Sequence, residues 1–150
     1  MRSLLLCAAI AICAVAAVPA AATPPADTTI TVDTTLPLDG SPGFGPFSAT
    51  GGVICPRGDT VDVLAQAAGF QSGKRLQLLV LKRFTCADGS GTFDLFLRVH
   101  LVFEPFTDVG TWTVVGGTGK YERLRGTGTL VATPTPAGVL DELNGGMHID

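Results

Sequence analysis

Four polar residues of acid–base type share one face of a predicted strand. Within and just after Thr92–Phe103, these residues are Asp94, Arg98, His100 and Glu104. Side chains an even number of residues apart point to the same side of a strand, so a carboxylate would lie near a histidine. If this face lined a cavity, Arg98, His100 and Glu104 would be the candidates for general acid–base work.

The other face of the same strand favours a simpler interpretation. It carries six apolar residues, Phe93, Leu95, Leu97, Val99, Leu101 and Phe103. In an antiparallel sheet with one face on the core, such a row turns inward and the polar row faces solvent. The alternation therefore favours solvent exposure of Arg98, His100 and Glu104 over a catalytic role.

A glycine-rich stretch over residues 112–130, WTVVGGTGKYERLRGTGTL, is the second feature that could do chemistry. It does not fit a dinucleotide-binding loop, because Glu122 stands where the third glycine of GxGxxG is needed. It does not fit a phosphate-binding loop either, because Lys120 is followed by Tyr121 rather than Ser or Thr. The sequence indicates no nucleotide cofactor.

Other catalytic and metal-binding patterns are also missing from the sequence. Ser48, Ser72 and Ser90 lack a GxSxG context, so a hydrolase nucleophile is not supported. The stretch 88–91 is too short for a calcium loop and is explained as a hairpin turn. Without a CxxC pair, and with only two histidines, we expect no metal site.

The first 22 residues have the pattern of a secretory signal peptide. Arg2 is followed by an apolar run over residues 4–18 and by small residues at 20–22. The run is short for a membrane span, and bulky residues before Cys7 and Cys13 disfavour a lipid anchor. We expect a signal peptide over 1–22, a flexible leader over 23–27, and a secreted, extracellular product without a stable membrane anchor.

Export bears on the two cysteines that remain, Cys55 and Cys86. A pair in an oxidising compartment is predicted to form a disulfide, which would stabilise a loop of about 30 residues by roughly 3–4 kcal/mol. Two buried free thiols are the alternative.

The formal charge is −3 for the whole chain and −4 after loss of Arg2, with no basic stripe. Nucleic acid is therefore not an expected partner.

Residues 28–150 are predicted to form one all-β domain. Alternating apolar and polar residues with Gly- and Pro-rich turns indicate eight strands and no long helix. The expected strands are 28–36, 47–55, 60–70, 75–86, 92–103, 109–115, 126–133 and 139–149. Strands joined by short turns pair with their neighbours, as in an antiparallel sandwich or barrel. A closed eight-stranded antiparallel β-barrel is favoured because it leaves no exposed edge.

The glycine-rich stretch also resembles the strand–turn–strand signature of the allene oxide cyclase and dirigent barrel superfamily. The match consists of Gly116, Gly117, Thr118, Gly119, Tyr121, Leu124, Arg125, Gly126 and Gly128. Residues 45–47, 54–56 and 81–93 extend the similarity to secreted bacterial proteins with an allene oxide cyclase-like barrel. Within this fold, the glycines would be structural, and Tyr121 and Leu124 would pack one helical turn against the mouth of the barrel.

The resemblance implies a barrel that encloses an apolar small molecule, which is our leading functional hypothesis. An isomerase or cyclase acting on a reactive lipid- or polyketide-like substrate is the alternative, and it rests on analogy with the family. An oligomeric extracellular structural protein is the third hypothesis, since related barrels associate through an outer face. The matched residues are scaffold positions, so no catalytic residue is transferred from the family.

Overall fold

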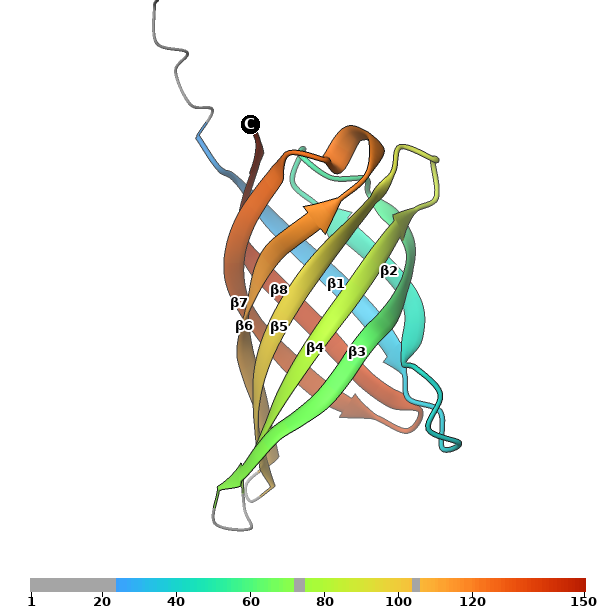
Figure 1. The fold of residues 1–150 in the computed structure, drawn as a ribbon, viewed down its shortest axis with the longest axis vertical. Coiled ribbons are helices and arrows are strands. Elements are labelled where there is room, and N and C mark those ends of the chain that lie inside the picture. Colours follow the sequence, from blue (N-terminus) through green and yellow to red (C-terminus); the bar gives the residue numbers. More distant parts are fainter. Residues whose placement is uncertain (1–23, 72–74, 104–105) are drawn as a thin grey trace, which may run out of the picture.

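The computed structural model describes residues 24–71, 75–103 and 106–150, and the side chains of residues 70 and 71 lie outside this description. The predicted signal peptide therefore lies outside the described residues. Eight strands follow one another along the chain, with one short 3₁₀ helix between the sixth and the seventh (Figure 1). They are β1 (Ala26–Thr35), β2 (Phe44–Thr50), β3 (Arg57–Gln71), β4 (Arg75–Cys86), β5 (Thr92–Phe103), β6 (Phe106–Gly117), η1 (Gly119–Tyr121), β7 (Leu124–Thr135) and β8 (Gly138–Ile149).

The strands form a closed antiparallel barrel in sequence order, as predicted. Closure comes from β1 and β8, which pair along the whole of β1 from Ala26↔Met147 to Thr35↔Gly138. This long first-to-last pairing distinguishes a barrel from a sandwich of two sheets, because no strand is left with an unpaired edge.

Several strand boundaries differ from the predictions. The expected second strand was to run to Cys55, but β2 ends at Thr50 and Cys55 lies in the following loop. The prediction that the prolines near 134 end the seventh strand was wrong, because Pro134 lies inside β7 and pairs with Val139 of β8. Pairing with neighbouring strands here outweighs the local tendency of proline to end a strand.

The barrel is closed at the end that carries η1. Phe47, Phe84, Phe93 and Tyr121 form an aromatic cluster there, with ring centroids 4.7 to 6.0 Å apart. Tyr121 of η1 and Leu124 at the start of β7 are both 1% exposed, so their side chains fill this end of the barrel. Trp112 fills the barrel above Gly128 and Gly145, where an added Cβ would lie 2.5 and 2.6 Å from its ring carbon Cζ2.

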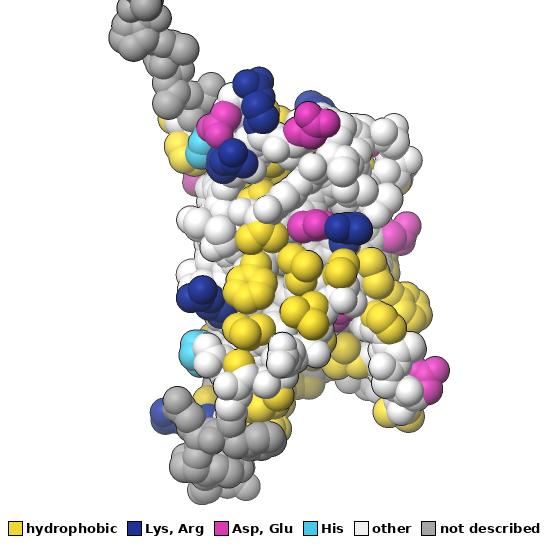
Figure 2. Space-filling view, in the orientation of Figure 1, with side chains coloured by type: hydrophobic (Ala, Val, Ile, Leu, Met, Phe, Trp, Pro, Cys, Tyr) yellow, Lys and Arg dark blue, Asp and Glu magenta, His cyan; other side chains and the backbone are white. Residues whose placement is uncertain are grey.

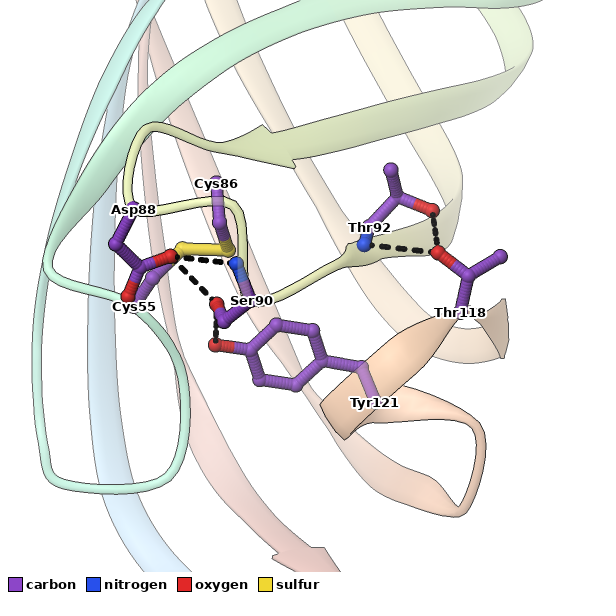
Figure 3. The surroundings of a disulfide bond; sticks show 7 residues. All are labelled: Cys55, Cys86, Asp88, Ser90, Thr92, Thr118 and Tyr121. Atoms are coloured by element: carbon purple, nitrogen blue, oxygen red, sulfur yellow. Dashed lines mark hydrogen bonds between the residues drawn. A yellow bond between two sulfur atoms is a disulfide. The ribbon is translucent and has the colours of Figure 1, made fainter.

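A disulfide joins Cys55 and Cys86 at this end of the barrel, as predicted (Figure 3). Next to it, the Tyr121 hydroxyl lies 3.0 Å from Ser90 Oγ, which in turn donates a hydrogen bond to Asp88 Oδ1 at 2.6 Å. The β4–β5 hairpin is therefore attached to the loop after β2 and to η1. These contacts fix the closed end and leave the opposite end as the place for a cavity.

Candidate functional site

A cavity of about 310 Å³ lies inside the barrel at the end opposite η1. Its walls are mainly apolar and come from β4, β5 and β8, including Leu78, Val80, Leu97, Val99, Leu101 and Val139. Five polar side chains also line it: Thr34, Asp62, Lys82, Asp108 and Asp141. An apolar pocket with a few converging polar groups has the usual composition of a small-molecule site.

Lys82 is the only lysine among the buried residues of the described chain, with 2% of its surface exposed. It lies in the inward row of β4 between Val80 and Phe84, so strand alternation directs its side chain into the barrel. Its Nζ donates a hydrogen bond to Thr34 Oγ1 at 2.9 Å and lies 2.8 Å from Asp62 Oδ1. The contact with Asp62 is an ion pair without the alignment of a hydrogen bond.

Asp62 points into the barrel by regular alternation, two residues after the buried Thr60, and β3 becomes irregular just after it. A register shift between Asp62 and Leu64 interrupts the pairing of β3 with β4. Asp62 and Ala65, three residues apart, therefore both line the cavity, which strict alternation would not allow. Gly43 gives the Asp62 side chain its room, because a Cβ on Gly43 would overlap Asp62 Oδ2.

Asp141 is the second carboxylate near the lysine. Its Oδ2 accepts a hydrogen bond from Thr34 Oγ1 at 3.1 Å and lies 3.6 Å from Lys82 Nζ. Burial raises the pKa of Asp141, while the nearby Lys82 charge and the Thr34 hydrogen bond oppose that rise. The ammonium group of Lys82 thus favours the charged form of Asp141, whereas burial favours the neutral form.

Asp108, near the start of β6, is the third carboxylate of the cavity, and no cation of the described residues pairs with it. Only 8% of its surface is exposed, and its Oδ1 has no hydrogen-bond partner. Burial raises the pKa of Asp108 to about 6, and the charge of Asp141 adds to this shift. Such a carboxyl group can accept or release a proton near neutral pH.

The cavity is therefore negatively charged when its groups are ionised. Among the described residues that line it, one ammonium faces three carboxylates, which gives a net charge of −2 when all four groups are ionised. The low-dielectric walls strengthen the field of these charges. Of the described residues, no group of three or more His, Cys, Asp or Glu is placed to hold a metal ion.

The residues first considered for acid–base chemistry lie elsewhere. Arg98 and His100 are exposed on the outer face of β5, because Leu97 and Val99 take the inward positions. Arg98 instead lies over the ring of Phe96, 5.8 Å from its centroid. Glu104 lies outside the described residues. The acid–base hypothesis for this strand required these side chains inside the barrel, and Arg98 and His100 do not reach the cavity.

The four charged residues of the cavity were not found from the sequence. Lys82 and Asp141 each stand at an inward position of a strand, between apolar neighbours, and that parity was a usable signal. Asp108 preceded the expected sixth strand, which was predicted to begin at residue 109. Asp62 shares its inward parity with the buried Thr60, whereas Ala65 departs from the alternation because a β-bulge follows Asp62.

Several glycines of the glycine-rich stretch stand where the backbone leaves little room for a side chain. Gly119 has a φ of +60° at the start of η1, where other residues are strained. Gly117, Gly126 and Gly128 lie against neighbouring backbone, whereas a Cβ on Gly116 would meet nothing within 4 Å. Arg125 is exposed and pairs with Asp150 at 3.2 Å.

Fold and cavity together define an antiparallel eight-stranded β-barrel with one plugged end and one apolar cavity that contains buried charges. No protein-family model, curated protein or solved structure that was compared with the chain matches it. Within the described ranges, no helix has the length and apolar character needed to cross a membrane.

Proposed function

We propose that the protein binds an apolar small molecule in the cavity at the open end of its barrel. The observation that carries this proposal is the cavity of about 310 Å³ with walls of Leu and Val side chains. Burying the apolar surface of a ligand against such walls contributes roughly 25 cal/mol per Å². Tyr121 and the aromatic cluster block the other end of the barrel, so a ligand would enter the cavity through the open end.

Obstructing the cavity tests this proposal. Val139 lines the cavity near its mouth, and the next residue, Leu140, is 40% exposed on the outer face. Ligands retained by the purified protein are identified by native mass spectrometry and solvent extraction, and a panel of apolar probes is titrated in parallel. We expect Val139→Phe to lower probe affinity at least tenfold and Leu140→Phe to leave it unchanged. Equal binding by both variants, or none by the wild type, would contradict the proposal.

Secretion is part of the proposed function. The signal-like residues 1–22 support it, and so does the Cys55–Cys86 disulfide, since disulfides persist mainly in oxidising compartments. Expression of the full chain in a secreting bacterial host would show a shortened protein in the periplasm or medium. A product that stays uncleaved in the cytosol would contradict this assignment.

Isomerase or cyclase activity is a second candidate function. One support is that buried groups in the apolar cavity can transfer protons: Asp108, and Asp141 with its partner Lys82. The other support is the resemblance to the allene oxide cyclase and dirigent superfamily. An isomerisation changes the chromatographic retention of a bound compound without changing its mass. Retained ligands and reactive lipid epoxides that return unchanged after incubation would argue against it.

Association with a second copy of the chain is also proposed. Apolar side chains gather on the outer face over the front strands (Figure 2), and those exposed on β3 and β6 include Val61, Val63, Leu64, Val109 and Val115. Exposed apolar patches of this kind mark interaction surfaces in soluble proteins. Light scattering at several protein concentrations measures the mass directly, and a monomer throughout would contradict the proposal.

A further inference from the structure

The three carboxylates of the cavity differ in how their charge is compensated. Lys82 Nζ lies 2.8 Å from Asp62 Oδ1 and 3.6 Å from Asp141 Oδ2, so the ammonium of Lys82 compensates the charges of these two carboxylates. Among the described residues, no cation pairs with Asp108, and its Oδ1 has no hydrogen-bond partner. It nevertheless lines the cavity, and its side chain is more than nine-tenths buried.

An unpaired carboxylate in an apolar cavity is costly for the protein alone. A buried charge loses its hydration and recovers that loss only with an opposite charge in good geometry. The nearby charge of Asp141 adds repulsion to this cost. A ligand that brought a positive group to Asp108 would remove both penalties, and this gain would appear as binding free energy.

On this basis we propose that the ligand is a basic amphiphile, with an apolar body against the Leu and Val walls and one protonated amine beside Asp108 and Asp141. This inference rests on the proposed function, that the cavity binds a small molecule. Lys82 supplies the precedent within the molecule, because it is itself an alkylammonium group held by carboxylates and a hydroxyl.

The charge of the cavity disfavours ligands with an anionic or a neutral alcohol head group. An anionic ligand would enter a site with a net charge of −2 and be repelled, in a setting where water screens little. A neutral alcohol could donate one hydrogen bond to Asp108 but would leave its charge uncompensated. The expected order of affinity is therefore amine, then alcohol, then carboxylate.

Three probes with the same eight-carbon chain test this order: octylamine, octanol and octanoate. Binding to the full chain is measured by isothermal titration calorimetry at pH 7.5. We expect octylamine to bind at least tenfold tighter than octanol, and octanoate to bind most weakly. Octanol or octanoate binding as tightly as octylamine would overturn the cation site while leaving the apolar cavity supported. No binding by any of the three would overturn the proposed function as well.

A matched pair of variants locates the amine. Asp108→Asn keeps the shape of the side chain and removes its charge, whereas Asp33→Asn removes a carboxylate from the exposed face of β1. Loss of the Asp108 charge should weaken octylamine about tenfold and leave octanol within about twofold, since one charge-assisted contact is worth about 1.4 kcal/mol or more. Asp33→Asn should change neither affinity. An octylamine affinity that survives Asp108→Asn would overturn the proposal.

The wild-type protein provides a test that needs no variant. The charged groups that face Asp108 across the cavity are Asp62, Lys82 and Asp141, and an alkylamine stays protonated throughout the range from pH 5 to 7.5. With a pKa of about 6, Asp108 loses most of its charge at pH 5. Octylamine should therefore bind about tenfold more weakly at pH 5 than at pH 7.5, and octanol equally at both. An octylamine affinity that is constant or rises toward pH 5 would contradict the proposal.

Discussion

Lys82 Nζ lies 2.8 Å from Asp62 Oδ1 in the interior of the barrel, where 3% of the lysine side chain and 7% of the aspartate side chain are exposed. Removing one partner of such a pair leaves the other as an uncompensated buried charge. We predict that Lys82→Met lowers the free energy of unfolding at pH 7 by about 3–5 kcal/mol. Urea unfolding followed by tryptophan fluorescence measures the change.

The next residue along β4 offers a matched control. Arg83 points to the opposite face and pairs with Asp94 at 2.8 Å, with 47% of its side chain exposed. Exposed pairs contribute about 0–1 kcal/mol, so Arg83→Met should have a small effect. Equal losses in the two variants would show that burial of the Lys82 pair does not determine its contribution.

Asp108 should make the stability of the barrel depend on pH. Its pKa is raised from 3.8 to about 6 in the folded protein, so the folded state binds a proton more readily than the unfolded chain. The stabilisation from this proton is fully present below pH 3.8 and is lost as the pH rises through about 6. We predict that Asp108→Asn gains about 2–3 kcal/mol in unfolding free energy relative to wild type between pH 4 and 8.

Urea unfolding of both proteins across this pH range measures that difference. Asp33→Asn, on the outer face of β1, serves as the control and should follow the wild-type curve. Asp108→Asn and wild-type curves that run parallel from pH 4 to 8 would show that the carboxyl group titrates alike in the folded and unfolded states.

Two glycines of the same motif should respond differently to alanine. Gly128 lies opposite Trp112 in the β6–β7 register, and a Cβ there would overlap both the indole ring and the carbonyl oxygen of Asn144. Gly116 has open space at the corresponding point. We predict a loss of about 1–3 kcal/mol for Gly128→Ala from overpacking, and a change within about 0.5 kcal/mol for Gly116→Ala. Thermal unfolding of both variants, with Gly116→Ala as the control of little expected change in stability, tests the packing role assigned to the motif.

The disulfide should stabilise the closed end of the barrel. Cys55 and Cys86 are separated by 31 positions, and cross-linking a loop of that size contributes about 3–4 kcal/mol. The double variant Cys55→Ala/Cys86→Ala is predicted to unfold at lower urea concentration. Reductant should bring the wild type to the same midpoint and leave the variant unchanged. Peptide mapping after thiol labelling without reduction should find both cysteines unlabelled; labelling of either would contradict the bond.

The barrel was predictable because its signals are local. In β5, the apolar row of Leu95, Leu97 and Val99 faces the core, because the opposite row is mostly polar. The turn at residues 87–91 sets the pairing of β5 with β4. Tyr121 and Leu124 were likewise recognisable as a plug from their spacing. The ends of β2 and β7 were placed wrongly, because a strand ends where its neighbours stop pairing, and that is not written in the local residues.

The eight alternating strands and the cysteine pair were evident from the residues alone, because both signals are local. The place of the charged cavity follows from the three-dimensional arrangement of the strands. Asp62, Lys82, Asp108 and Asp141 are separated by 20 to 33 positions from one to the next and belong to four different strands. Barrel closure brings them to one cavity, where burial raises the pKa of Asp108 to about 6 and also raises the pKa of Asp141.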